Sequence, residues 1–415
     1  MCALPFVHYS IKPNNQIKPC CRFMTWLPEH SEFDPINVQT HTPQQALNSE
    51  PMQRVRDAML RGEPIPGCAK CYQEEEATQG LSMRTSSNDI WDVKRYLDGH
   101  TELRFIEVAF GNYCNLSCRT CGSGLSTSWS EDDAVLKPLY PERENAKQIL
   151  DVEFTWKPDD FNLVEEIKFT GGEPMLHPNF IKFLDVIIEG SNESHITLDI
   201  FTNTSWTPKD KVLSRLNRFK RVKIWLSIDG VGKLQDYVRN GSTWDKVRES
   251  ADAWCKMEHD KPETYGIILT PTLNMYNVLN FMDTVEWWVA LRDKYNLPLG
   301  SRQSPGDIVT SVVIFPDSLN IKHLPEKQEL IDRLTEYNEQ RQNSLVEKTS
   351  FKIRSLLSKQ LDAEIDLVKF VEFTKDLDRL RAQSFKDYNP ELYALIDKHL
   401  QLQGTSYDEI KGRLK

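Results

Sequence analysis

The feature that most constrains the fold is an alternation of strand-like and helix-like segments that begins near residue 103. Six runs rich in β-branched and aromatic residues predict strands, at residues 103–110, 164–170, 195–202, 222–228, 264–270 and 308–315. Amphipathic segments such as 179–188 and 209–219 lie between several of them, which indicates a parallel sheet with right-handed crossovers. Six units are too few to close an eight-stranded barrel. The sequence therefore predicts an α/β fold, an open, partial (β/α)6 TIM-like barrel.

Two further regions flank this predicted barrel, which we assign to residues 96–320. Residues 1–95 are irregular, rich in proline and turn residues, and carry five cysteines, so we expect a small N-terminal cysteine-rich domain. Residues 321–415 are charged, with apolar residues recurring at spacings of three and four, which predicts a C-terminal helical extension packed on a core. The long gap at 122–163 predicts extra helices or a substrate loop.

The cysteines are unevenly distributed, since eight of the nine lie within the first 121 residues. The N-terminus lacks a cationic start followed by an apolar core, and the apolar runs are too short to span a membrane, so we expect a cytoplasmic protein. Persistent disulfides are rare in that compartment, so the clustered cysteines are interpreted as metal ligands. The ninth, Cys255, lies in a helix-like stretch and is expected to be a small buried residue. The net charge of −10 provides no general attraction for nucleic acid.

Three cysteines follow the first predicted strand in the sequence GNYCNLSCRTC, a C-x3-C-x2-C spacing formed by Cys114, Cys118 and Cys121. Three thiolates so close together can hold three corners of a cubane iron–sulfur cluster and leave one iron open. A structural zinc site would need a fourth, distant ligand and is the alternative. Loops after strand ends form the active-site face of α/β barrels, so the position of the trio favours a functional cluster.

This motif resembles the C-x3-C-x-Φ-C motif of the radical S-adenosylmethionine (SAM) superfamily, with Thr120 at the usually apolar Φ position. The resemblance implies that the open iron of a [4Fe-4S] cluster binds the amino and carboxylate groups of SAM, and that Thr120 contacts the adenine through its backbone. It further implies reductive cleavage of SAM to a 5′-deoxyadenosyl radical, which abstracts a substrate hydrogen. An electron donor such as flavodoxin or ferredoxin is implied as a partner.

Later strand ends supply further candidate SAM-binding residues. The second predicted strand ends in TGGEP, where Gly171 and Gly172 permit close backbone approach and Glu173 can accept from an ammonium group, as in the GGE motif of the family. By resemblance, polar residues at the next two strand ends and one arginine also lie near SAM. These are Asn203, Ser227, Asp229 and Arg239. The alternative for Asn203, Ser227 and Asp229 is an ordinary structural role in the turn that follows each strand. The alternative for Arg239 is a solvated arginine.

The N-terminal cysteines indicate a second metal site. Four of them, Cys2, Cys20, Cys68 and Cys71, could bind either zinc or an iron–sulfur cluster, and their spacing does not choose between the two. The segment SIKPNNQIKPCC resembles the SPASM and twitch auxiliary-cluster domains, with Asn15 in place of a glycine, and Asn tolerates a left-handed turn. The resemblance therefore favours an auxiliary [4Fe-4S] cluster. Adjacent strand residues point to opposite faces, so we do not expect Cys20 and Cys21 to bind the same metal. The spacing favours Cys20, and Cys21 is the alternative ligand.

Three functions remain open from the sequence. Resemblance to the auxiliary-cluster subgroup favours radical modification of a peptide or protein. Radical oxidation or rearrangement of a small molecule, such as a sugar or nucleotide, is the second. A non-catalytic metal-binding scaffold is the third, and the intact set of Cys114, Cys118, Cys121 and Glu173 disfavours it. The sequence identifies no catalytic acid or base.

Overall fold

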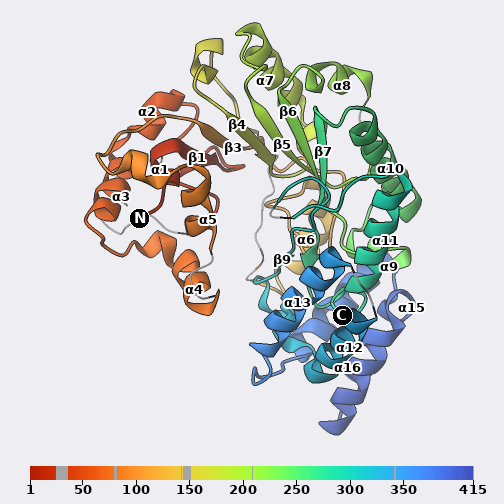
Figure 1. Cartoon of the computed structure of the whole chain (residues 1–415). Coiled ribbons are helices and arrows are strands. Elements are labelled where there is room, and N and C mark those ends of the chain that lie inside the picture. The colour runs from red at the N-terminus through yellow and green to blue at the C-terminus, as the bar shows by residue number, and fades with distance from the viewer. Residues whose placement is uncertain are drawn as a thin grey trace. The chain divides into compact units, whose positions relative to one another are not determined.

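A computed structural model describes residues 1–24, 36–78, 82–141, 143, 151–207, 209–301, 303–340 and 343–414. Seven strands form one sheet in the order β2-β1-β3-β4-β5-β6-β7, and two short strands, β8 and β9, form a second sheet (Figure 1). The strands are β1 (His8–Ile11), β2 (Ile17–Lys18), β3 (Phe105–Ala109), β4 (Glu166–Thr170), β5 (Thr197–Thr202), β6 (Arg221–Leu226), β7 (Tyr265–Leu269), β8 (Thr272–Leu273) and β9 (Ser311–Val312). This mixed α/β architecture agrees with the predicted partial barrel.

The chain divides into two compact units, each described separately. The first contains Met1–Tyr113, Gln148–Phe201 and Pro208–Val222, and the second contains Cys114–Lys147, Thr202–Thr207 and Lys223–Lys415. Helices of the first unit are α1 (Leu4–Val7), α2 (Pro43–Leu47), α3 (Glu50–Leu60), α4 (Ala69–Thr78), α5 (Met83–Ile90), α7 (Pro178–Glu189) and α8 (Asp210–Leu216). Those of the second are α6 (Ser130–Leu136), α9 (Lys233–Val238), α10 (Trp244–Asp260), α11 (Phe281–Lys294), α12 (Lys327–Glu339), α13 (Ser344–Ser358), α14 (Val368–Arg381), α15 (Phe385–Tyr388) and α16 (Pro390–Leu402).

In the first unit, parallel strands present one apolar face and one polar face. The buried side chains of Ile167 and Phe169 alternate with Glu166, Lys168 and Thr170 along β4. Helix α7 covers the apolar face, since its Phe180 and Phe183 rings contact the ring of Phe169 at centroid distances of 5.1 and 5.8 Å. His177 caps that helix by accepting the N–H of Asn179 at 3.2 Å, and Pro178 fits its first turn.

The N-terminal residues belong to this same sheet. Strand β1 pairs parallel with β3, with His8 opposite Phe105 and Ser10 opposite Glu107, and it pairs antiparallel with β2. The turn between β1 and β2 places Asn15 at φ +68°, which confirms the left-handed conformation expected where asparagine replaces glycine. The division at residue 95 expected from the sequence thus differs from the compact units, because β1 is hydrogen-bonded into the sheet.

The second unit carries the C-terminal helices. Side-chain caps mark their starts: Asn343 accepts two backbone N–H groups at the start of α13, and Asn389 accepts the N–H of Leu392 at the start of α16. Each of the five helices from α12 to α16 buries apolar side chains, so the predicted helical extension is confirmed.

Five predicted strands correspond to β3, β4, β5, β6 and β7, and the predicted helices at 179–188 and 209–219 correspond to α7 and α8. The sixth prediction, residues 308–315, is reduced to β9, which pairs with β8 outside the seven-stranded sheet. The gap at 122–163 contains α6, although 142 and 144–150 lie outside the described residues.

Cys255 is fully buried in α10, as expected. Within the described part of the chain, none of the helices has the length and apolar character needed to cross a membrane.

Candidate functional site

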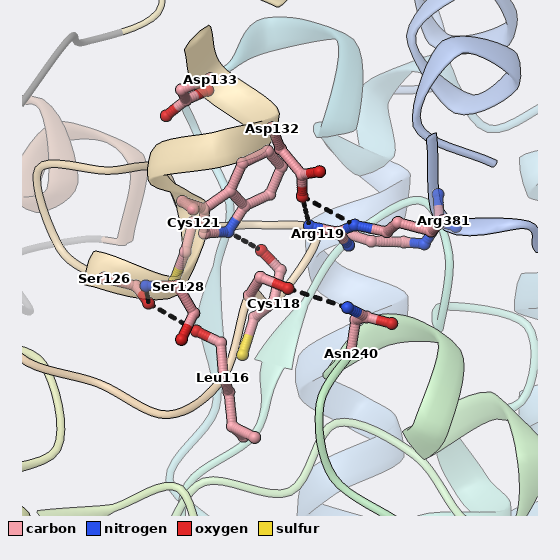
Figure 2. Close-up of polar contacts among 12 residues, drawn as sticks. Leu116, Cys118, Arg119, Cys121, Ser126, Ser128, Asp132, Asp133, Asn240 and Arg381 are labelled. Atoms are coloured by element: carbon pink, nitrogen blue, oxygen red, sulfur yellow. Dashed lines mark hydrogen bonds and ion pairs between the residues drawn. The ribbon is translucent and has the colours of Figure 1, made fainter. Parts of the chain in front are cut away.

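The cysteine loop after β3 is fixed by hydrogen bonds to its backbone carbonyls, all within the second unit. The Cys118 carbonyl accepts the indole N–H of Trp129 at 2.8 Å, and the Cys121 carbonyl accepts Nη2 of Arg143 at 3.0 Å. Hydroxyl groups that follow in the chain donate to the earlier carbonyls. The Ser126 hydroxyl donates to the carbonyl of Leu116, and the Thr127 and Ser128 hydroxyls both donate to the carbonyl of Cys114. Figure 2 shows the contacts to the carbonyls of Cys118 and Leu116. Irregular backbone with its carbonyls satisfied in this way is held in one conformation.

The three thiols differ in their surroundings. Cys118 is buried, with 5% of its surface exposed, whereas Cys114 and Cys121 are half-buried. A hydrogen bond between Cys118 and Cys121 raises the pKa of Cys118 well above its ordinary value and lowers the pKa of Cys121. Asn203 Nδ2 lies 3.7 Å from the sulfur of Cys114. Within the part of the chain that the structure describes, no three His, Cys, Asp or Glu side chains already form a metal-binding group.

An arginine–aspartate pair stands beside the loop. Arg239 Nε donates to Asp229 at 2.8 Å, and its Nη1 lies 3.9 Å from the sulfur of Cys118. Burial by itself would lower the pKa of Arg239, but the Asp229 carboxylate and the Cys118 sulfur raise it. The other oxygen of Asp229 accepts the N–H of Thr272 at 2.7 Å, so this carboxylate is occupied on both sides. A fixed cation next to a cysteine favours its thiolate, which is the form that binds iron.

The TGGEP segment lies in the first unit and packs tightly on the chain that leads into the cysteine loop. Gly172 donates to the carbonyl of Gly111 at 3.1 Å, and the Glu173 N–H donates to the carbonyl of Tyr113 at 2.8 Å. A Cβ atom on Gly172 would come within 2.1 Å of that Tyr113 oxygen, so no larger residue fits. Glu173 is buried, with 1% of its surface exposed.

A match to a protein-family model accompanies this geometry. Residues 108–285, which contain the cysteine loop, TGGEP and the Arg239–Asp229 pair, match the model described as Radical SAM superfamily. The match identifies residues 108–285, less than half of the chain, as a radical SAM domain. No curated protein sequence matches it.

Solved structures resemble the chain only remotely. Streptococcus suis SuiB bound to S-adenosylmethionine is 13% identical, with 66% of this chain and 58% of that one covered and a TM-score of 0.34. SuiB bound to precursor peptide SuiA is 12% identical, with coverage of 76% and 66% and a TM-score of 0.35. The AdoMet-bound anSMEcpe is 12% identical, with coverage of 56% and 57% and a TM-score of 0.38. The chain thus spans less than two thirds of the length of these proteins.

The remaining polar residues expected near SAM in this radical SAM domain occupy different positions. Asn203 donates to Asn115 at 2.8 Å and accepts the hydroxyl of Ser205 at 2.7 Å, so its amide is fixed beside Cys114. Ser227 is half-buried, and its backbone N–H donates to Thr202 at 2.9 Å. Thr120 is half-buried between Arg119 and Cys121 in the chain.

The N-terminal cysteines gather around a separate cavity in the first unit. Cys2, Cys20, Cys68 and Cys71 all line it, together with apolar residues such as Leu4 and Met83. Cys21 does not line this cavity. Burial raises the pKa of Cys21, and the Glu107 carboxyl adds to this effect. The Cys21 sulfur lies 3.9 Å from the sulfur of Met83.

Backbone N–H groups are directed at three of the four sulfur atoms that line the cavity. The N–H groups of Leu4, Arg22 and Arg84 donate to Cys2, Cys20 and Cys71, respectively. Burial raises the pKa of Cys2 to about 12 and that of Cys68 to about 11, and neighbouring thiols add to both effects. Hydrogen bonds of this kind accompany thiolates that bind metals.

The sequence interpretation missed a polar row across the sheet. Ser10, Glu107, Lys168 and Asp199 lie opposite one another on neighbouring strands, and Lys168 Nζ donates to Glu107 at 3.2 Å. The signal was present, because a charged residue occupies the third position of each of the three strands β3, β4 and β5.

Proposed function

We propose that this protein is a radical SAM enzyme that cleaves S-adenosylmethionine reductively at a [4Fe-4S] cluster held by Cys114, Cys118 and Cys121. When bound, the cluster and SAM supply the 5′-deoxyadenosyl radical, which abstracts hydrogen from a peptide or protein substrate. The observation that carries this proposal is the cysteine loop within the matched domain, whose three thiols come from a single segment with its carbonyls fixed. That donor set fits a cluster with one open iron.

Several residues of the chain would hold SAM. The buried carboxylate of Glu173 suits the amino group, and Gly171 and Gly172 keep the adjacent backbone close to residues 109–113. Asn203 and Ser227 offer polar atoms for the ribose and carboxylate, and the backbone of Thr120 is the candidate contact for adenine. Asp229 has both of its oxygens engaged, so we assign it the role of orienting Arg239 beside Cys118.

We also propose an auxiliary [4Fe-4S] cluster at Cys2, Cys20, Cys68 and Cys71. The shared cavity and the N–H···S hydrogen bonds support four thiolates around one centre. Four cysteines would saturate such a cluster, which leaves an electron relay or a structural clamp as its role. Zinc bound by the same four thiols is the alternative.

The auxiliary site favours a peptide or protein substrate, because relatives with such cysteine domains mostly modify peptides. In this assignment residues 1–95 carry the auxiliary site, 96–320 the radical SAM barrel and 321–415 the helical extension. An acidic chain disfavours nucleic acid, and a flavodoxin or ferredoxin would provide the electron. All nine cysteines are free thiols, which fits a reducing cytoplasm.

Anaerobic reconstitution tests the central assignment. The wild-type protein should bind iron and produce 5′-deoxyadenosine from SAM in the presence of a strong reductant. Cys118→Ala removes one of three cluster ligands, so we expect SAM cleavage to fall at least a hundredfold, consistent with losses for disrupted metal sites. Iron content and chromatographic detection of 5′-deoxyadenosine are the two measurements.

Cys255→Ala is the matched control, because Cys255 is also buried but lies in α10 outside the loop. It should retain wild-type iron content and SAM cleavage. Cleavage by Cys118→Ala at the wild-type rate would show that the trio does not hold the catalytic cluster.

A further inference from the structure

The C-terminal helix α14 reaches the cysteine loop through two ion pairs of opposite polarity. Asp378 of α14 accepts from Arg119, which lies between Cys118 and Cys121 in the chain. Arg381, one turn later, donates to Asp132 of α6 through Nε at 3.0 Å and Nη2 at 2.7 Å. Figure 2 shows Arg381 and Asp132 beside the loop. Because α14 supplies one anion and one cation, while the loop and α6 supply their respective counter-charges, the two contacts fix the register of α14 against both segments.

The second pair is connected to a cluster ligand through Trp129. The guanidinium carbon of Arg381 lies 4.6 Å from the centre of the Trp129 ring, and that of Arg143 lies 4.3 Å from it. The fully buried indole donates its N–H to the Cys118 carbonyl at 2.8 Å. A shift of Arg381 would therefore move the ring that holds the backbone of Cys118.

Burial makes the charge of Arg381 consequential. Its side chain is 5% exposed and that of Asp132 is 19% exposed, so solvent and salt screen the pair weakly. Among the described residues, Nη1 of Arg381 is buried without a hydrogen-bond partner. Burial lowers the pKa of Arg381, and the Asp132 carboxylate opposes that effect.

We propose that α14 is part of the cluster site, and that Arg381 is a positioning residue that sets the reduction potential of the cluster through Asp132 and Trp129. This inference rests on the proposed cluster at Cys114, Cys118 and Cys121. Reduction adds one negative charge to the cluster. A buried cation nearby favours that charge, and a buried carboxylate without its counter-charge opposes it.

Arg381→Gln removes the cation and leaves Asp132 uncompensated, so the cluster becomes harder to reduce. At a fixed applied potential we expect the ratio of reduced to oxidised cluster to fall about tenfold. This corresponds to a reduction potential lower by about 59 mV for a one-electron couple. Asp132→Asn leaves Arg381 uncompensated and should shift the potential in the opposite direction. Arg381→Lys retains the charge and should restore most of the potential. Electron paramagnetic resonance during a redox titration of the reconstituted protein measures all four proteins.

Arg379→Gln is the matched control, since Arg379 lies on the exposed side of the same helix and donates to the Leu414 carbonyl. Its potential should equal that of the wild type. Equal potentials for the wild type, Arg381→Gln and Asp132→Asn would overturn the inference while leaving the cluster assignment intact. If Arg381→Gln fails to fold or to bind iron, the reduction potential of Asp132→Asn tests the proposal. A potential higher than that of the wild type supports the proposal, and an unchanged potential rejects it. Absence of iron from the wild type would instead reject the proposed function.

Discussion

At the scale of single residues, the closest packing in the candidate site is at Gly172. Any Cβ atom there would meet the Tyr113 carbonyl carbon at 2.6 Å and its oxygen at 2.1 Å, and both are backbone atoms that cannot rotate away. Gly172→Ala should therefore destabilise the protein by about 1–3 kcal/mol, as overpacking typically does. It should also disturb the segment that leads into Cys114. Urea unfolding and iron uptake measure the two effects.

Gly122→Ala provides the comparison for this change. A Cβ on Gly122 would have its nearest contacts at 3.4 Å from Arg143 Nη2 and 3.6 Å from Asp133 Oδ2, which an added methyl group can tolerate. We expect a change of about 0.5 kcal/mol or less at this position. Equal stability of Gly172→Ala and Gly122→Ala would contradict the close approach of TGGEP to Tyr113.

Single residues also show why part of the site escaped prediction. Cys114, Cys118, Cys121 and Glu173 stand in short motifs, so spacing along the chain identifies them. Spacing along the chain does not identify the ion pairs beside the loop. Arg119 pairs with Asp378, 259 positions away, and Arg381 pairs with Asp132, 249 positions away. Each of these residues resembles a solvated charge in its own segment. Only tertiary packing brings the pairs together.

At the scale of elements, the polar row across β1, β3, β4 and β5 links the strands electrostatically. Burial would raise the pKa of the Glu107 carboxyl, but Lys168, Lys12 and His8 together hold it below its ordinary value. Lys168→Met leaves that buried carboxylate without its hydrogen-bonded partner, so we expect a loss of about 3 kcal/mol at pH 7. Urea unfolding at several pH values measures the loss.

The pH dependence of this effect follows from the direction of the shift. A carboxyl with a depressed folded-state pKa stabilises the fold above its unfolded pKa, about 4.3, and this stabilisation is lost as the pH falls through the folded value. In Lys168→Met the same carboxyl has a raised pKa, so the deficit relative to the wild type should shrink as the pH falls from 7 toward 4. Lys182→Met, at an exposed position of α7, should show neither effect. A deficit that does not vary with pH would contradict the ion pair.

The elements also show how far a pattern of residues determines the fold. Strands β3 to β7 and helix α7 follow from apolar runs and periodicity, since local sequence determines which face each element buries. Strand β1 was not predicted, because its four residues, HYSI, resemble an irregular segment until they pair with β3. Likewise, the run at 308–315 has strand-like residues, but only Ser311 and Val312 form a strand, and Ile308 makes an isolated parallel bridge to Leu269 of β7. Pairing between distant segments decides both cases.

At the scale of the whole molecule, each compact unit carries its own set of thiols. The first contains the four cysteines around the N-terminal cavity, and the second contains the loop cysteines. If both sets hold [4Fe-4S] clusters, the reconstituted chain should bind about eight irons, and about four irons plus one zinc if the N-terminal set holds zinc. Each set then loses its metal independently, so metal content can be assigned to one unit by changing a single cysteine.

Cys68→Ala makes this assignment. It removes one of four ligands, so we expect iron content to fall from about eight to about four per chain while the cluster of the trio remains. Cys21→Ala is the matched control, because Cys21 adjoins Cys20 in the chain but its thiol interacts with Glu107 outside the cavity. It should keep all of its iron. Loss of iron from Cys21→Ala but not from Cys68→Ala would show that the cavity does not bind the auxiliary cluster, because a thiol that lines it would then be dispensable and one that does not line it would be required.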